Sequence, residues 1–195
     1  MYKPSETTSN ALFGSNVSIA MHCYDEGMIV DPNVIAQFWN VISNDKRTKT
    51  AFAKQGGKTL ADLQAAMLRR NTRFLFIYNN TKPGALIWVN NTLHGTADVH
   101  VLGMTSSYGR DMVKLCRIAI GHLFSLCSQI NTPLYHTLIG KVATSNKLAI
   151  RLAIRCGMTV VGTVPNYALD HTTYKLIDAT LLYLNNPLTI GGDDK

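Results

Sequence analysis

The chain lacks the sequence features of secreted and membrane-spanning proteins. No apolar run reaches the roughly 18 residues that a membrane helix needs, and the first residues, MYKPSETTSN, contain neither the basic nor the apolar part of a signal peptide. The 4 cysteines form no C-x-x-C pair, and 3 of them fall on apolar faces of expected helices, which predicts buried, reduced thiols. We therefore expect a cytoplasmic protein without a membrane partner.

Several catalytic motifs are absent as well. The sequence contains no H-E-x-x-H, G-x-S-x-G, Walker loop, dinucleotide-binding glycine fingerprint or zinc-ligand spacing. Each of these motifs carries one chemistry, because its spacing brings metal ligands, a nucleophile or phosphate-binding amides together. Their absence argues against a metal centre and against nucleotide hydrolysis.

Acidic residues are scarce. Only 12 Asp and Glu residues stand against 19 Lys and Arg residues, and the formal net charge of +7 suits an anionic partner such as a phosphate-bearing cofactor or nucleic acid. Lys147, Arg151 and Arg155 repeat at helical spacing. No aromatic residues that stack on bases are interleaved with them, so a solvated helix face is favoured, and a nucleic-acid partner stays an open alternative.

What the sequence does contain is enough apolar residues for one core. It has 195 residues, 46% of them hydrophobic, which is typical of a single globular domain. The first residues are polar and rich in Ser and Thr, and the chain ends in LTIGGDDK. We expect one domain over 16–186, a flexible segment at 1–15 and a flexible tail at 187–195.

Apolar periodicity predicts alternating strands and helices. Helical spacing follows Asp31-Pro32, begins again at Thr59, and covers 109–131 and 145–156. Alternating or continuous apolar stretches predict strands at 16–24, 73–80, 84–95, 96–104, 133–143, 159–164 and 172–184. Turn residues separate the second, third and fourth of these strands, which predicts an antiparallel meander. The order as a whole predicts a mixed α/β fold.

The stretch SNKLAIRLAIRCGMTVVG, residues 145–162, combines a capped helix with an abrupt stop. Ser145 or Asn146 can cap its start, and Gly157 can adopt the left-handed conformation that ends it. The pattern N-x-x-A-x-x-L-x-x-x-x-G-apolar is matched by Asn146, Ala149, Leu152, Gly157 and Met158. In this pattern and in its element order, the chain resembles the GNAT (GCN5-related N-acetyltransferase) family.

The resemblance implies a mixed, mostly antiparallel sheet with flanking helices and a splayed central strand pair. It also implies that the pantetheine arm of acetyl-CoA lies in the V-shaped cleft between these strands. A family member binds the cofactor pyrophosphate on backbone amides of a Q/R-x-x-G-x-G/A loop at the start of the long helix. Here the loop reads MTSSYGRDMVK, with Tyr108, Asp111 and Val113 at the motif positions. The cofactor loop is therefore degenerate.

Some phosphate donors nevertheless remain in this loop. Gly109 can still bend freely, and Ser106, Ser107 and Arg110 offer hydroxyl, amide and guanidinium donors, whereas Asp111 in the first helical turn opposes a phosphate. The resemblance implies these cofactor-binding residues: Leu102, Gly103, Met104, Ser106, Ser107, Tyr108, Gly109, Arg110 and Asn146.

Catalysis in the family needs a base on or near the fourth strand, and often a Tyr on the last helix that protonates the leaving thiolate. The Tyr position falls on Ala153, which has no proton to donate. Asp98 and His100 share one face of the expected fourth strand, so His100 can act as the base and Asp98 can orient it. A lone strand histidine is also common as a purely structural residue.

Weaker candidates lie near the C-terminus. Tyr167, Asp170 and His171 fall in a turn that borders the acceptor pocket in the family, although such turn residues are usually only solvated. Asp178 matches an aspartate of the family's final strand, and we expect it to be architectural.

Three functions stay open. The first is an N-acyltransferase that moves an acyl group from acetyl-CoA to a primary amine of a small molecule or a protein. The second is a noncatalytic GNAT-shaped binding or structural protein, and the third is a nucleic-acid binder. The VHVLG strand and the helix ending in HLF are similar to GNAT-like proteins of tailed bacteriophages and prophages, which implies a virion or host-interaction component for the second function.

Overall fold

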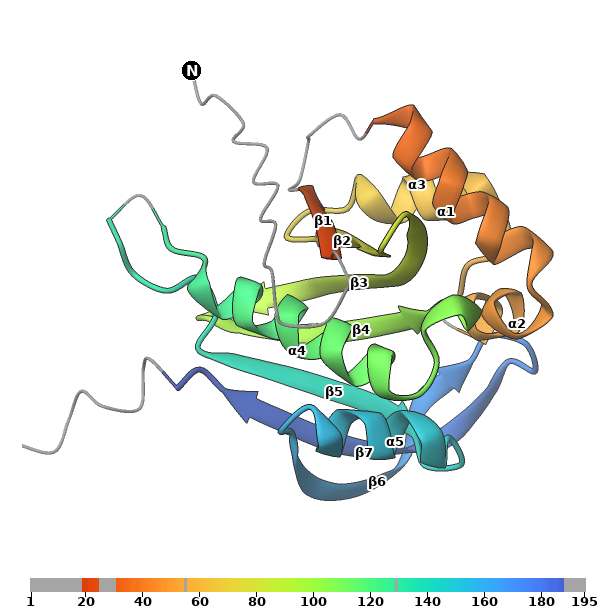
Figure 1. The fold of residues 1–195 in the computed structure, drawn as a ribbon. Helices are drawn as coiled ribbons and strands as arrows, with labels where there is room; N and C mark the ends of the chain where they lie inside the picture. Colours follow the sequence, from red (N-terminus) through yellow and green to blue (C-terminus); the bar gives the residue numbers. More distant parts are fainter. Residues whose placement is uncertain (1–18, 25–30, 55, 129, 188–195) are drawn as a thin grey trace, which may run out of the picture.

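The computed structural model describes residues 19–24, 31–54, 56–128 and 130–187, and Figure 1 shows their arrangement. The elements up to the middle of the chain are β1 Ile19–Tyr24, α1 Pro32–Asn44, α2 Lys46–Lys54, α3 Leu60–Met67, β2 Arg73–Asn79, β3 Lys82–Leu93 and β4 Thr96–Gly103. They are followed by the 3-10 turn η1 Thr105–Ser107, α4 Arg110–Ser125, β5 Thr137–Ala143, α5 Lys147–Arg155, β6 Thr159–Asp170 and β7 Lys175–Asn185. The segment 1–15 and, apart from its first residue, the tail 187–195, which we expect to be flexible, lie outside the described ranges.

The strands form one seven-stranded sheet in the order β1-β2-β3-β4-β5-β7-β6. Neighbouring strands are antiparallel except β4 and β5, which are parallel. The predicted meander is β2-β3-β4, and its turns take positive φ at Asn80, His94 and Gly95. The mixed, mostly antiparallel α/β fold is therefore confirmed.

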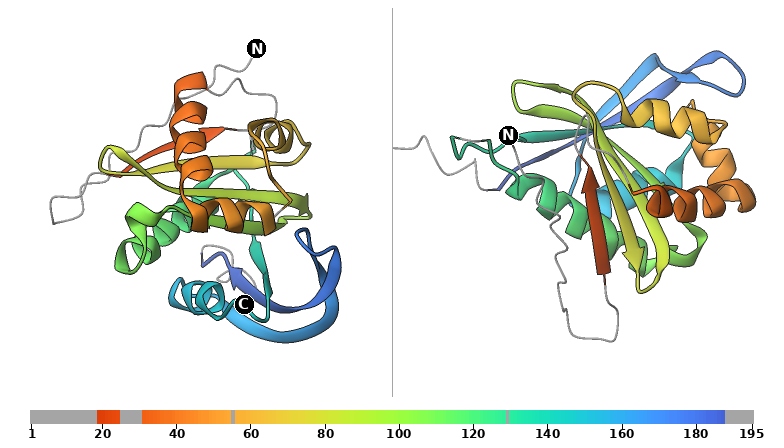
Figure 2. Two further views of the ribbon diagram at one scale, coloured as in Figure 1. Left: turned by 90° about the vertical axis from the view of Figure 1, so that its right-hand side faces the viewer. Right: turned by 90° about the horizontal axis from the view of Figure 1, so that it is seen from above.

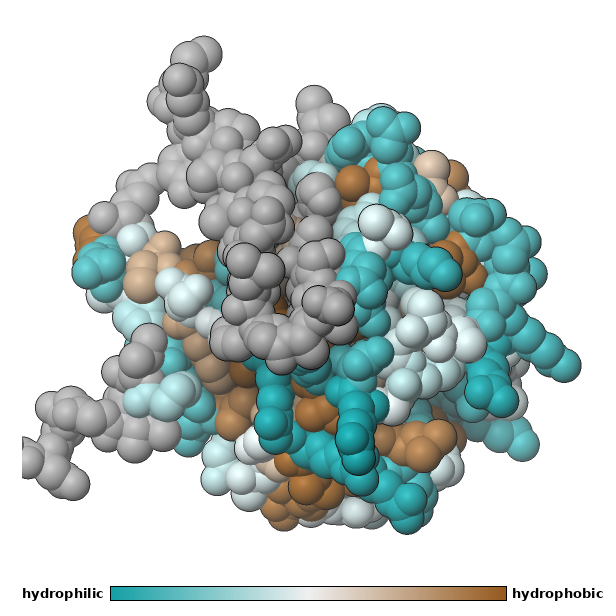
Figure 3. Space-filling view, in the orientation of Figure 1, coloured by the Kyte–Doolittle hydropathy of each residue, from teal (hydrophilic) through white to brown (hydrophobic). Residues whose placement is uncertain are grey.

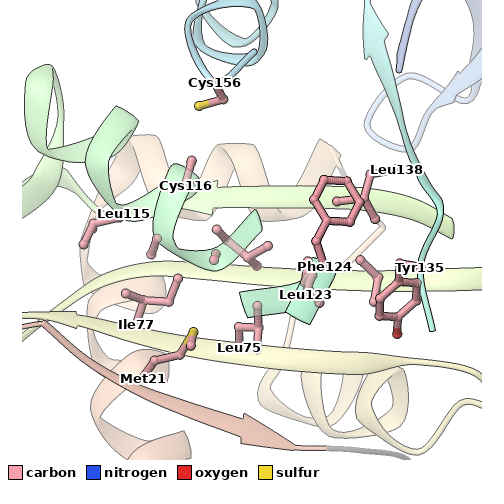
Figure 4. Close-up of a cluster of buried hydrophobic side chains, with 14 of the residues drawn as sticks. Met21, Leu75, Ile77, Leu115, Cys116, Leu123, Phe124, Tyr135, Leu138 and Cys156 are labelled. Atoms are coloured by element: carbon pink, nitrogen blue, oxygen red, sulfur yellow. The ribbon is translucent and has the colours of Figure 1, made fainter. Parts of the chain in front are cut away.

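Helices cover both faces of this sheet, as the views in Figure 2 show. Successive side chains of a strand point to opposite faces, so Leu75 and Ile77 of β2 pack under α4, whereas Phe74 and Phe76 pack under α1 and α3. Figure 4 shows the α4 side of this core. Both faces of β2 are buried, which explains why its sequence is continuously apolar rather than alternating.

The predicted helix ends are confirmed at three helices. Asp31 caps α1 by accepting a hydrogen bond from the Asn33 amide at 2.8 Å, and Thr59 forms a capping box with an aspartate three residues on. At the end of α5, Gly157 has φ +99°. The Met158 amide donates to the Ala153 carbonyl at 3.0 Å, the bond that closes a Schellman motif.

Two expectations about the helices were wrong. The helix expected over 109–131 is α4, which ends at Ser125, because Ser128 and Thr132 close a separate turn through a 2.7 Å backbone bond. Cys127 is therefore exposed instead of lying on a buried helix face, while Cys116 and Cys156 are buried free thiols as predicted. The side chain of the remaining cysteine lies outside the described residues.

The second error is α2, which the sequence pattern did not predict. Only Thr48 and Phe52 of its sequence KRTKTAFAK are buried. The helix is therefore too short to show the repeating apolar stripe by which a longer helix is predicted. Within the described ranges, no helix is long and apolar enough to cross a bilayer.

Candidate functional site

The central feature of the sheet is the separation of β4 from β5. The two strands pair only at Thr96 with Thr137, Ala97 with Leu138 and Asp98 with Ile139. Beyond this point β4 continues to Gly103 beside β3, and β5 continues to Ala143 beside β7. The splayed central strand pair is therefore present, and it begins at Asp98.

The loop after β4 leads directly to the start of α4. Gly109 takes φ +93° there, so the one free-bending position of the loop is used as expected. Among the described residues, no side chain caps the first amides of α4. The carboxylate of Asp111 instead accepts a hydrogen bond from the Asn79 amide group at 3.3 Å. The N-terminal amides of α4 remain the kind of group that binds an anion.

A cationic hollow of about 470 Å³ lies on α4, lined by Arg110, Val113, Lys114, Arg117 and Ile118. These residues follow helical spacing and share one face of the helix. Arg117 also donates two hydrogen bonds to the Arg155 carbonyl at the end of α5, at 2.7 and 3.2 Å. Figure 3 shows hydrophilic residues over this side of the molecule, with hydrophobic residues between them.

The predicted cofactor residues fall into two groups. Leu102, Met104 and Ser107 are at most 1% exposed as whole residues, so in this structure neither their side chains nor their backbones are open to solvent. The hydroxyl of Ser106 donates to the Pro83 carbonyl at 2.8 Å, which anchors the loop to β3.

The second group remains accessible. Tyr108 is 45% exposed, and Arg110 is exposed at the start of α4. Asn146 caps α5 by accepting a hydrogen bond from the Ala149 amide at 3.1 Å. Its role in this structure is thus to start the helix beside the separated strands.

His100 lies on the face of β4 that α1 to α3 cover. Its ring stacks on the indole of Trp88, with centroids 5.0 Å apart and planes 8° apart, and Nε2 lies 3.1 Å from Asn90 Oδ1. Burial lowers the pKa of His100 below its usual value, against the opposing effect of the Asp98 carboxylate. The neutral imidazole is therefore favoured at pH 7, and the same burial makes it a weaker base than an exposed histidine.

Asp98 does not make the contact with His100 that the sequence suggested. Its Oδ2 accepts hydrogen bonds from Lys141 Nζ at 2.7 Å and from Asn91 Nδ2 at 2.8 Å. The imidazole is held by Asn90 instead. The orienting role expected for Asp98 therefore has no direct bond to support it, although both side chains lie on one face of β4 as predicted.

The C-terminal candidates take different positions. Asp170 accepts hydrogen bonds from Thr172 within the β6-β7 turn, and Asp178 accepts one from the Asn166 amide at 3.1 Å, so both close local structure. Tyr167 places its ring 5.7 Å from Lys141 Nζ. The expectation that Tyr167 falls in a turn was wrong, because β6 continues to Asp170 and Tyr167 lies within this strand, where it contacts Lys141.

Sequence reasoning missed Lys141, Asn90 and Asn91. A single lysine inside the apolar strand sequence TLIGKVA was the available signal for Lys141, because a charge inside a strand needs a partner. The two asparagines stand at the end of the apolar run of β3, opposite the start of β4. Their contacts depend on strand register, which the sequence did not reveal.

Comparison with known proteins agrees with this geometry. No protein-family model matches the chain, and no curated protein sequence matches it. Among solved structures, a probable GNAT-family acetyltransferase from Chromobacterium violaceum superposes with a TM-score of 0.68 at 13% identity, covering 95% of this chain and 89% of that one. The chain has the GNAT fold.

Two further structures with this fold are described with ligands. The Microcin C7 self immunity acetyltransferase MccE, in complex with acetyl-CoA and AMP, has a TM-score of 0.64 at 16% identity, over 87% of this chain and 92% of that one. Spermidine N-acetyltransferase from Vibrio cholerae, in complex with CoA and spermine, has a TM-score of 0.63 at 14% identity, over 86% and 95%. At these identities the likeness establishes the fold.

Proposed function

We propose that the chain is an acetyl-CoA-dependent N-acyltransferase that acts on a primary amine. The observation that carries this proposal is the separation of β4 and β5 beyond Asp98, followed by the uncapped start of α4. The similar structures support it, because two of them are described as acetyltransferases in complex with acetyl-CoA or CoA.

The residues present fit a phosphate-bearing cofactor in part. The free amides at the start of α4 and the cations Arg110 and Lys114 would hold its phosphates, and the backbone of Gly103 would line its arm. Acetyl-CoA supplies an acyl group activated as a thioester. Asp111 is the feature that opposes the fit, since it places a carboxylate in the first turn of α4.

On the acceptor side, His100 is the proposed base. Its neutral imidazole takes a proton from the acceptor ammonium, and Asn90 and Trp88 hold the ring in place. Ala153 cannot protonate the leaving thiolate, so this proton comes from water or from Tyr108 or Tyr167. The acceptor is an amine-bearing small molecule or protein.

Titration calorimetry with acetyl-CoA, followed by a thiol-release assay with polyamine, peptide and aminoglycoside acceptors, tests this function. We expect binding, slow turnover and a loss of at least about tenfold in rate for His100→Ala, because a positioned base contributes about 10²- to 10⁴-fold. Activity that is unchanged in this variant would eliminate His100 as the base. Absence of binding at millimolar acetyl-CoA would exclude the acyltransferase.

A second candidate is a noncatalytic GNAT-fold binding or structural protein. The ion pair of Lys141 with Asp98 favours this candidate, because the lysine ammonium lies on the face of β4 where His100 would meet an acceptor amine. Ala153 favours it as well, because it stands where the family often has the tyrosine that protonates the leaving thiolate. Cofactor binding without thiol release for any acceptor would support this candidate. The phage origin implied by two short sequence stretches gains no support from the similar structures.

A further inference from the structure

Lys141 brings a primary amine of the chain itself to the point where β4 and β5 separate. Its Nζ lies 2.7 Å from Oδ2 of Asp98, which occupies the last paired position of β4, opposite Ile139. Lys141 lies two residues beyond Ile139 and therefore on the same face of β5. The Lys141 side chain thus reaches from β5 to β4 at the point where the two strands begin to separate. It does so on the face of the sheet that also carries His100.

The ammonium group of Lys141 is held in place. The side chain of Asp98 is only 9% exposed, and that of Lys141 is 33% exposed. Asn91 fixes the same carboxylate oxygen, and the ring of Tyr167 lies 5.7 Å from Nζ. The contacts with Asp98 and Tyr167 restrict the rotamers of Lys141, and its amine still reaches solvent.

We propose that Lys141 is an acylation site, which takes the acetyl group of acetyl-CoA when this donor occupies the separation between β4 and β5. The inference rests on the proposed binding of acetyl-CoA. A nucleophile positioned beside a bound thioester reacts as in a unimolecular step, which favours Lys141 over lysines that lie away from the separation of β4 and β5.

The step balances as follows. The ammonium of Lys141 first loses one proton to solvent, and Asp98 accepts its hydrogen bond during this loss. The free Nζ attacks the thioester carbonyl carbon, a C–N bond forms, and the C–S bond breaks. The second proton of the nitrogen leaves with coenzyme A, which departs as the thiol, and a neutral amide remains on Lys141.

The surroundings of Lys141 set the pH dependence of this step. Asp98 and His100 face Nζ from β4, and Tyr167 faces it from β6. Burial alone lowers the pKa of Lys141, but the hydrogen bond and charge of Asp98 outweigh it, and the net pKa is raised. We therefore expect slow acylation near pH 7, with a rate that rises about tenfold per pH unit below this pKa.

The experiment uses the full chain with acetyl-CoA, and it reads acylation by intact mass and peptide mapping. Exposed Lys58 and Lys175 are internal comparators in the same digest. Acetyl phosphate replaces acetyl-CoA in a parallel arm, because it acetylates lysines without a cofactor site. Free coenzyme A is added in a further arm as a competitor, and Lys141→Arg keeps the charge while removing the acceptor amine.

We expect one acetyl group per chain on Lys141, with a rate that saturates with acetyl-CoA, falls with added coenzyme A, and exceeds that at Lys58 and Lys175 at least about tenfold. The Lys141→Arg variant should stay unmodified at the corresponding peptide. Equal modification by acetyl phosphate, or a rate that coenzyme A does not lower, overturns the inference.

Calorimetric binding of acetyl-CoA, measured on the same sample, separates the two proposals. Binding with an unmodified Lys141 overturns the acylation site and leaves the acyltransferase proposal standing. Absence of both binding and modification overturns both.

Discussion

Replacing Lys141 by Met should destabilise the fold more than neutralising its partner Asp98. The substitution leaves the carboxylate of Asp98, whose side chain is 9% exposed, with Asn91 as its remaining donor. Breaking a fully buried ion pair from one side costs about 3–5 kcal/mol. Here the Lys141 side chain is 33% exposed and one hydrogen bond survives, so we expect a loss of about 1–3 kcal/mol.

The opposite substitution has a smaller expected effect. In Asp98→Asn the amide oxygen still accepts a hydrogen bond from Asn91, and the lysine ammonium can turn to solvent, so the loss should stay below about 1 kcal/mol. The double variant should be more stable than the sum of the two single losses predicts, because no unpaired carboxylate remains in it.

Urea unfolding of the four proteins, followed by fluorescence and circular dichroism, measures these differences as shifts in midpoint at a constant slope. Lys49→Met is the matched control, since it removes an exposed lysine of α2. A Lys141→Met midpoint equal to that of the control would refute the reasoning. A larger loss in Asp98→Asn than in Lys141→Met would refute it as well, because the desolvated carboxylate would then not be the source of the cost.

Three further predictions concern the fold, the base and the cofactor loop. Gly157→Val should lower the free energy of unfolding by about 1 kcal/mol or more in urea, through its φ of +99° rather than through crowding, as the nearest atom to an added Cβ belongs to Leu184 at 3.8 Å. The pKa of His100 is lowered in the folded chain, so the unfolded chain takes up the proton first and stability falls as the pH drops below about 6.5. His100→Phe, which keeps the stack on Trp88, should reduce this fall when melting temperatures are measured across a pH series. An equal fall in the variant would contradict the assignment of this pH dependence to His100. Arg110→Ala should weaken acetyl-CoA binding by about 1–3 kcal/mol in titration calorimetry, and an unchanged Kd would remove Arg110 from the site.

Much of the fold was predictable because the deciding signals are local. Caps at Asp31, Thr59 and Asn146 and the stop at Gly157 each act within four residues of the chain. The sheet face is also local information, since alternation along β4 correctly placed Asp98 and His100 side by side.

The errors have two different causes. The end of α4 depends on a local competition, because the turn that Ser128 closes with Thr132 replaces a further helical turn. The partner of Asp98 depends on the parallel register of β4 and β5, which brings Lys141 within reach from 43 residues away. No sequence window contains such a pair.

The strand β4 therefore serves three purposes at once, and its alternation explains how. Ala97, Val99 and Val101 pack into the core under α4, which fixes the strand. Asp98 and His100 point to the opposite face, which α1 to α3 cover. Their titratable groups lie where β4 and β5 begin to separate. Past Asp98 the backbone edge of β4 no longer pairs with β5. The side chains of Asp98 and His100 therefore lie next to this unpaired stretch of backbone. A substitution on the α4 face should for this reason alter stability before chemistry, and one on the opposite face should alter chemistry first.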